Sequence, residues 1–305
     1  MNPHHNLKFR TERNTLKEPK SGVHMARGDF MARLSKLKHV ALDMDGTIYK
    51  GGTLFPYTID FLKKLRRLGV HYSFLTNNPS KSIDAYIKNL EKRGIEAERE
   101  EIYNSTLATI DFLKAKRPEI KKIFLLGTPS MIEEFERAGY ISAKDDPRDV
   151  PDAVIVAFDM SLTYPRLCRA SWWVKKGIPY FATNPDKICP TDQELILPDC
   201  ASICACVETA TGRKPDIVFG KPDPSMLTGI IGRNNYTPEE VAMVGDRIYT
   251  DLMTAHNAGT LGVLVLTGEA TLADAKAANP PIDLVVDSIE VLGNLIEETR
   301  IFKNE

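Results

Sequence analysis

The sequence lacks any hydrophobic run long enough to cross a membrane. A membrane-spanning helix needs about 20 apolar residues in succession, and no segment of the 305 residues comes near this length. Residues 1–22 also lack the apolar segment of a secretory signal. Cysteine is scarce, and its odd number, five, is typical of free thiols in a reducing compartment. We therefore predict a cytoplasmic protein that has no membrane partner.

The sequence has almost no excess of charge of either sign. Its 40 Lys and Arg residues and 41 Asp and Glu residues give a formal net charge of −1. Proteins that bind nucleic acids usually carry a basic excess on the binding domain. The charge balance therefore argues against a nucleic-acid partner.

Strand and helix patterns alternate along most of the chain. Residues 38–45 and 70–78 have the apolar character of strands, and residues 57–69 between them have the periodicity of an amphipathic helix. The same alternation continues to the end of the sequence. It predicts an α/β fold in which helices cover parallel sheets, with ligands bound at the carboxyl ends of the strands.

An acid pair stands at the end of the first predicted strand, in the stretch ALDMDGTIY. Asp43 and Asp45 are two residues apart, so strand geometry turns both toward the same face, while Met44 should point into the fold. A hard cation such as Mg²⁺ would remove the repulsion between them. One carboxylate could then attack an electrophile, and the other, surrounded by negative charge, could hold a proton. The alternative is an ordinary Asp-Gly turn.

A second acidic cluster follows another predicted strand. Asp246 comes directly after the apolar run VAMVG, and Asp251 stands five residues further on. A tight loop can return both carboxylates to one cation. The alternative is a helix N-cap followed by an acidic residue in the first turn.

Two further strand ends carry groups that suit an anion. Thr76 offers a hydroxyl, and the amides that follow it, beginning with Asn77, could bind a phosphate at the start of the next helix. Lys221 lies between Gly220 and Pro222 and could bind a phosphate as a point charge. A capping threonine and an exposed loop lysine are the alternatives. Together with the two acid pairs, these groups form a full set for phosphoryl transfer.

In this order, the four motifs DMDGT, LTNN, GKPDP and GDRIYTD resemble those of the haloacid dehalogenase-like phosphatases. The resemblance covers residues 38–300, and the long insert resembles the cap of the NagD and p-nitrophenyl-phosphatase branch. It implies that Asp43 is the nucleophile that forms an aspartyl-phosphate. It implies that Asp45 protonates the leaving oxygen and then activates water, while its backbone carbonyl binds Mg²⁺.

The resemblance implies roles for the other motif residues too. Thr76, Asn77 and Lys221 would bind the phosphoryl group. Asp246 would bind Mg²⁺ together with Asp43 and Asp45, and Asp251 would support the metal shell.

The resemblance also implies a core and a cap, and the basic, polar and aperiodic sequence of residues 1–35 indicates an extension before them. We expect a Rossmann-like core at residues 36–103 and 209–305, an inserted smaller α/β cap at residues 104–208, and an N-terminal extension at residues 1–35. In the cap, loops after strands offer substrate contacts, and the alternative is that these are structural turns. The candidate residues are Asp159, Asn184 and Asp186. A homodimer formed through the cap is compatible with the resemblance.

The predicted function is therefore a Mg²⁺-dependent phosphatase acting on small soluble phosphomonoesters: sugar, glycerol, nucleotide or cofactor phosphates. Asp45 argues against a dehalogenase, because a halide leaving group needs no proton. Two alternatives stay open. One is a phosphotransferase or mutase, which shares the first step, and the other is a sensor that binds phosphometabolites without turnover.

Overall fold

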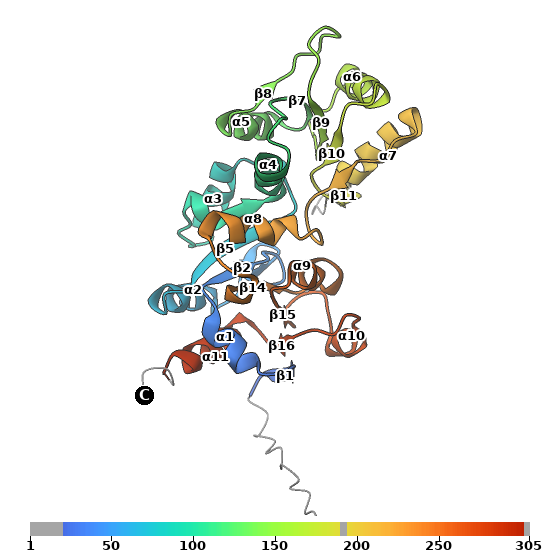
Figure 1. Cartoon of the computed structure of the whole chain (residues 1–305). Helices are drawn as coiled ribbons and strands as arrows, with labels where there is room; N and C mark the ends of the chain where they lie inside the picture. Colours follow the sequence, from blue (N-terminus) through green and yellow to red (C-terminus); the bar gives the residue numbers. More distant parts are fainter. Residues whose placement is uncertain (1–20, 190–193, 302–305) are drawn as a thin grey trace, which may run out of the picture.

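The larger of two parallel sheets forms the lower lobe of the molecule (Figure 1). The computed structural model describes residues 21–189 and 194–301. All strands of this sheet are parallel except β1, which pairs antiparallel with β16 at one edge. In spatial order they are β1 (Val23–Ala26), β16 (Leu284–Val286), β15 (Leu261–Val265), β14 (Val241–Gly245), β2 (His39–Leu42), β5 (His71–Thr76) and β6 (Ile102–Asn104).

Helices cover both faces of this sheet, which explains why β2, β14 and β15 are fully buried and, apart from His39 at the start of β2, apolar. One face packs against α1 (Phe30–Lys36), α2 (Thr58–Arg67), α3 (Ile83–Glu91) and α11 (Ile289–Ile301). The other packs against α4 (Ser105–Lys116), α8 (Ser225–Asn234) and α9 (Met253–Ala258). The predicted Rossmann-like core is confirmed.

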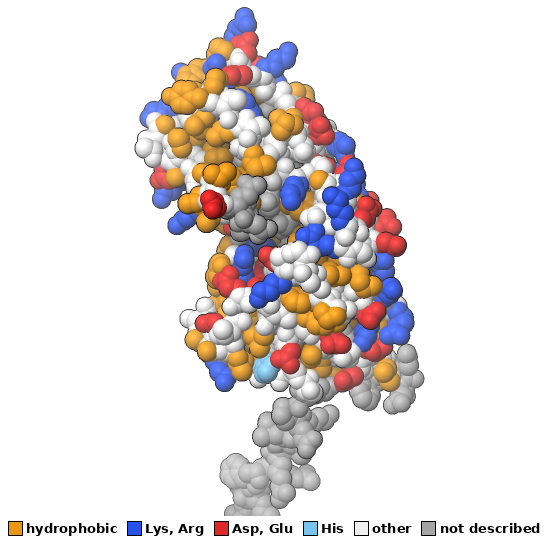
Figure 2. All heavy atoms as spheres, turned by 180° about the vertical axis from the view of Figure 1, so that it is seen from behind, with side chains coloured by type: hydrophobic (Ala, Val, Ile, Leu, Met, Phe, Trp, Pro, Cys, Tyr) orange, Lys and Arg blue, Asp and Glu red, His pale blue; other side chains and the backbone are white. Residues whose placement is uncertain are grey.

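The smaller sheet forms the upper lobe, and its five strands are all parallel. Their order is β13 (Ile217–Val218), β10 (Tyr180–Ala182), β9 (Ala153–Val156), β7 (Lys122–Leu126) and β8 (Ile141–Ser142). On one face lie α4 and α5 (Pro129–Arg137), and on the other lie α6 (Tyr164–Lys175) and α7 (Cys200–Thr211). The predicted inserted α/β cap is confirmed as a fold, and Figure 2 shows an indentation between the lobes on one side.

Short elements complete the described chain. They are the ribbons β3 (Tyr49–Lys50) with β4 (Thr53–Leu54) and β11 (Ile188–Cys189) with β12 (Leu197–Pro198), the helix α10 (Leu272–Ala277), the 3-10 helices at Arg99–Glu101 and Pro238–Glu240, and the π-helix at Ile248–Leu252. None of the helices within residues 21–189 and 194–301 is long and apolar enough to span a bilayer.

The strand pairing differs from the predicted boundaries at two places. The expected extension at residues 1–35 is wrong for its second half, because β1 and α1 are built into the core. Val23 and Met25 alternate with outward-facing residues, a pattern too short to indicate a strand from the sequence. Residues 1–20 lie outside the described part. At the other boundary, β13 still pairs with the cap strand β10, so the chain re-enters the core after Val218 rather than at residue 209.

A buried histidine in the core makes stability depend on pH. His39 begins β2, its Nε2 lies 2.9 Å from the Ser73 hydroxyl, and burial lowers its pKa to about 4. An unfolded chain binds a proton near pH 6.5, so stability is full above that pH and falls as the pH drops toward 4. We expect the protonation of His39 on unfolding to lower the free energy of unfolding by about 2 kcal/mol at pH 5, relative to pH 7.

The measurement is urea unfolding at pH 7 and pH 5 for the wild type and His39→Gln, which keeps a polar atom near Ser73. The variant should lose about 2 kcal/mol less between the two pH values. Equal losses in both proteins would show that His39 does not carry this pH dependence.

Candidate active site

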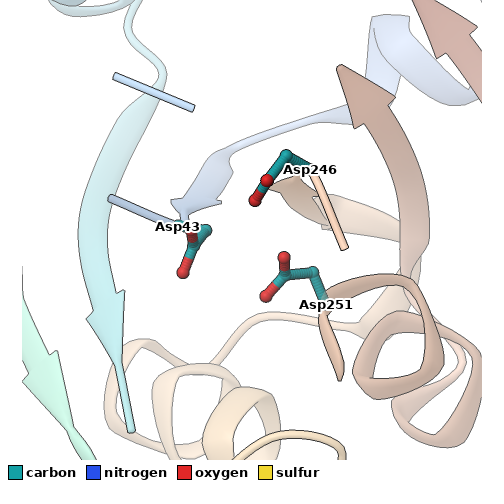
Figure 3. A group of neighbouring side chains, drawn as sticks. All are labelled: Asp43, Asp246 and Asp251. Atoms are coloured by element: carbon teal, nitrogen blue, oxygen red, sulfur yellow. The ribbon is translucent and has the colours of Figure 1, made fainter. Parts of the chain in front are cut away.

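Three carboxylates meet where the strand order of the large sheet reverses. Asp43 follows β2, Asp246 follows the neighbouring strand β14, and Asp251 comes from the π-helix after it. Figure 3 shows the three side chains gathered around a common space. One oxygen of each lies within 4.8 Å of the others. The sequence correctly predicts that these residues come together, because carboxyl ends of parallel strands share one edge.

Three glycines allow the carboxylates to come this close to the backbone. A Cβ on Gly46, whose φ is +84°, would lie 2.5 Å from Asp246 Oδ2. A Cβ on Gly268 would collide with Asp246, and one on Gly245 would collide with Asp251. Neither Gly245 nor Gly268 was predicted from the sequence as a site residue. Only the adjacency of Gly245 to Asp246 in GDRIYTD could have indicated one of them.

Burial raises the pKa of the clustered acids. For Asp43 the pKa rises to about 6, chiefly through burial, although the nearby Lys221 opposes the rise. Burial likewise raises the pKa of Asp246 and of Asp251, and neighbouring acids add to both effects. The sequence predicted that one acid of the pair Asp43 and Asp45 is surrounded by negative charge. In the structure that acid is Asp43, and Asp45 is exposed and lies outside the cluster.

The donor set fits a divalent cation. Oxygen ligands from carboxylates are what Mg²⁺ and Ca²⁺ prefer. Asp246 Oδ2 accepts the Glu269 amide at 2.7 Å, but its buried Oδ1 has no hydrogen-bond partner among the described residues. Such an orphaned oxygen is costly unless a cation meets it. Asp251 lies in the same cluster, so its carboxylate could itself be a ligand of the cation, whereas the sequence predicted only that it supports the ligands.

Lys221 is a buried positive group in contact with two of the clustered carboxylates. Its side chain is 7% exposed, and its Nζ bonds Asp43 and lies 2.7 Å from Asp251 Oδ1. Burial by itself would lower its pKa, but Asp251 and Asp43 raise it more, so the net shift is upward. Lys221 is therefore a fixed cation beside Asp43.

Asn77 holds the backbone of Lys221 from both sides. Its Oδ1 accepts the Lys221 N–H at 2.6 Å, and its Nδ2 donates to the Lys221 carbonyl at 3.1 Å. The predicted phosphate contact thus cannot come from this side chain as it lies, and only its backbone stays a candidate. Thr76 ends β5, and its hydroxyl accepts the Asn78 N–H at 3.2 Å and lies beside the Tyr86 hydroxyl, so its contact with an anion stays a prediction.

Asn77→Ala should lower both activity and stability. The substitution leaves two backbone groups of Lys221 without partners, at a cost of about 1–3 kcal/mol of unfolding free energy. A displaced Lys221 ammonium should reduce kcat by about tenfold to a hundredfold. The measurements are thermal unfolding and kcat with p-nitrophenyl phosphate.

The matched control is Asn78→Ala at the next position. Asn78 holds the following turn by accepting the Ser80 N–H at 2.9 Å, and it has no hydrogen bond to Lys221. Its kcat should stay within a few-fold of the wild type. A kcat for Asn77→Ala within twofold of the wild type would contradict the role in positioning Lys221.

Asp45 projects away from the carboxylate cluster into a loop. Its Oδ1 accepts the N–H of Gly51, in the turn between β3 and β4, at 3.0 Å. Met44 between the two aspartates is buried in the core, as predicted. The acid pair therefore separates into one enclosed and one solvent-facing carboxylate.

The cap residues behave differently from one another. The Asp159 carboxylate is enclosed and binds Arg166 at 2.9 Å and Ser161, so it already has partners within the cap, and its contact with substrate stays a prediction. Asn184 is buried too, and donates to Asp199 and Asp186 at 2.9 and 3.0 Å. Its backbone borders Gly220, the neighbour of Lys221. Asp186 is half-buried, and its contact with substrate stays a prediction.

Comparison with known proteins identifies relatives over most of the chain. Residues 40–141 match the model of the haloacid dehalogenase-like hydrolases, and residues 218–292 match a model described as HAD-hydrolase-like. An acid sugar phosphatase of Staphylococcus aureus (strain USA300) is 31% identical over 248 residues, which is 81% of this chain and 93% of that protein.

Solved structures show the same likeness. A 4-nitrophenylphosphatase from Thermotoga maritima is 37% identical, with a TM-score of 0.78 over 86% of this chain and 98% of its own. The glycerol phosphate phosphatase Rv1692 from Mycobacterium tuberculosis, in complex with magnesium, is 27% identical, with a TM-score of 0.76 over 84% of this chain and 77% of its own.

Proposed function

Since the chain belongs to the haloacid dehalogenase-like hydrolases and is a phosphatase of their p-nitrophenylphosphatase and NagD branch, we propose that it hydrolyses small phosphomonoesters with Mg²⁺ through an aspartyl-phosphate. The observation that carries the proposal is the cluster of Asp43, Asp246 and Asp251 around the buried Lys221. A nucleophile, cation ligands and a fixed positive charge converge there at one point.

In the first step, a carboxylate oxygen of Asp43 forms a bond to phosphorus while the bond from phosphorus to the ester oxygen breaks. Asp45 gives its proton to that leaving oxygen. Lys221 and the Thr76 hydroxyl stabilise the charge on the phosphoryl oxygens. A divalent cation held by Asp43, Asp246 and the backbone of Asp45, with Asp251 beside it, would supply further positive charge.

In the second step, water attacks the phosphorus of the aspartyl-phosphate and Asp45 accepts the proton of that water. The bond between phosphorus and the Asp43 oxygen breaks, which releases phosphate and restores the carboxylate. Asp45 suits both steps because it is exposed and, in the part of the chain that the structure describes, its side chain is held only by the Gly51 amide. That single hydrogen bond can be exchanged for one to the leaving oxygen.

For the substrate we propose sugar phosphates and glycerol phosphates first. The support is the names of two relatives, an acid sugar phosphatase and a glycerol phosphate phosphatase. Nucleotide and cofactor phosphates, a cytoplasmic location and a cap-mediated homodimer stay predictions from the sequence.

The test is phosphate release by the full chain from p-nitrophenyl phosphate and from a panel of hexose, pentose, glycerol and nucleoside monophosphates. We expect turnover with Mg²⁺ and none above background after chelation. Failure on every ester with Mg²⁺ present would overturn the proposal. Transfer of phosphate to an added alcohol in place of its release would favour the phosphotransferase instead.

A further inference from the structure

A groove separates two helices at the junction of the lobes. Figure 1 shows α4 and α8 next to each other there, and the groove between them holds about 490 Å³. Its walls are made of small side chains, Ala108 and Ala115 on α4 and Gly229 and Gly232 on α8, with Phe112 beside them. Sites for small molecules commonly have this volume and an apolar lining.

A buried hydroxyl without a partner lines the same groove. Ser225, the first residue of α8, is only 8% exposed, and its Oγ has no hydrogen-bond partner among the described residues. A buried hydroxyl left in this state costs free energy that a suitable ligand atom would recover. This feature is independent of the small residues and indicates an occupant with a polar atom.

The rim of the groove has a surplus of positive charge. Arg233 binds Asp111 through two hydrogen bonds of 2.6 and 2.9 Å, and the Tyr103 hydroxyl donates to Asp111 at 2.8 Å. Asp111 is therefore neutralised within the protein. Lys116 stands on the same rim and forms no ion pair within residues 21–189 and 194–301. The free ammonium favours a ligand that carries one negative group.

Both walls of the groove begin close to Lys221. At the start of α4, the Ser105 hydroxyl donates to the Asn77 carbonyl at 2.6 Å, and the Asn77 side chain holds the Lys221 backbone. At the start of α8, Ser225 follows Lys221 by four positions in the chain. A shift of α4 against α8 would therefore reach Lys221 through Ser105 and Asn77.

We propose that the groove is an effector site for a small organic anion with an apolar body, and that its occupation changes turnover through Lys221. The apolar body would lie against Phe112 and the small residues, and the anionic group would face Lys116. Binding at the groove does not depend on the proposed function. Only the effect on turnover does.

The probe is 8-anilinonaphthalene-1-sulfonate, an aromatic sulfonate whose fluorescence reports binding, titrated into the full chain. The blocking variant is Gly232→Leu, because a Cβ there meets no atom within 4 Å and a leucine suits a helix better than glycine. Its matched control is Lys114→Leu, an exposed α4 position outside the groove. Both variants should keep the circular dichroism and basal kcat of the wild type.

We expect saturable binding that weakens about tenfold or more in Gly232→Leu and stays within twofold in Lys114→Leu. Lys116→Gln, or N-phenyl-1-naphthylamine, which lacks the sulfonate, should weaken it about threefold or more. At saturation, kcat with p-nitrophenyl phosphate should change at least about twofold in the wild type and not in Gly232→Leu.

Equal binding by the wild type and Gly232→Leu would overturn the site, and equal binding of the uncharged probe would overturn its anionic ligand class. Binding without a change in kcat, or a change that persists in Gly232→Leu, would overturn the link to Lys221. If the wild type has no phosphatase activity at all, the fluorescence titration still decides whether the site exists.

Discussion

Asp43→Asn should abolish turnover, with kcat for p-nitrophenyl phosphate reduced by about four orders of magnitude or more. The amide oxygen of asparagine can still accept the hydrogen bond of Lys221, but it cannot serve as the attacking oxygen. Asparagine has almost the same shape as aspartate, so the fold around the strand end should persist. The measurement combines steady-state kinetics with thermal unfolding, which separates a lost nucleophile from a lost fold.

The informative control is Asp45→Asn. p-Nitrophenolate leaves without needing a proton, so Asp43 in this variant can still take the phosphoryl group, while attack by water is slowed. The phosphorylated protein should therefore accumulate and appear in intact mass spectra as one added phosphoryl group. The same adduct must be missing in Asp43→Asn. Substantial turnover by Asp43→Asn would disprove the proposed mechanism, whatever Asp45→Asn does.

Removal of the divalent cation should have the second largest effect. Chelation, or Asp246→Asn with Mg²⁺ present, should lower kcat by about a thousandfold, since both remove charge stabilisation at the phosphoryl group. Asparagine at position 246 can still accept the Glu269 amide that Asp246 Oδ2 binds at 2.7 Å. The loss should therefore come from the cation and not from the loop.

The same cluster predicts how stability responds to pH and Mg²⁺. Because the folded pKa of Asp43 is raised to about 6, the folded chain binds the proton more tightly than the unfolded chain does. Stability of the metal-free protein therefore declines as the pH rises from about 4 through 6 and stays lower above that. The raised pKa values of Asp246 and Asp251 act in the same direction.

Mg²⁺ should consequently raise the melting temperature clearly at pH 7.5 and much less at pH 5. Asp246→Asn should melt higher than the wild type without metal at pH 7.5, and its response to Mg²⁺ should be small. Differential scanning fluorimetry with and without chelator measures both. An equal Mg²⁺ shift at the two pH values, or in both proteins, would exclude this cluster as the cation site.

The sequence predicts what repeats along the chain and what lies at strand ends. Alternating strands and helices indicated parallel sheet covered by helices, and the family resemblance indicated the inserted cap. Because parallel strands end at a common edge, Asp43 and Asp246 could be placed together. The burial of Met44 followed from the two-residue repeat of a strand, because its side chain points away from those of Asp43 and Asp45. These predictions need only local geometry and one rule of topology.

The remaining features depend on contacts between distant segments. Asn77 holds Lys221 across 144 residues, and Gly268 makes room for Asp246 only once the sheet has formed. Neither has a local pattern. Asp159 is different, because its partner Arg166 lies seven residues away, and that spacing offered a signal for a structural role.

The course of the chain between the lobes has a consequence for how such a protein can diversify. The chain leaves the large sheet just before Ser105 and returns just before Lys221, and both residues contact Asn77. The upper lobe is thus inserted into the large-sheet domain at a single place, where both connecting segments contact Asn77. We predict that the loops of this lobe contact the substrate, and we therefore expect their replacement to change which phosphate esters are hydrolysed while the reacting groups stay in place. New specificities could arise in this way on one catalytic core.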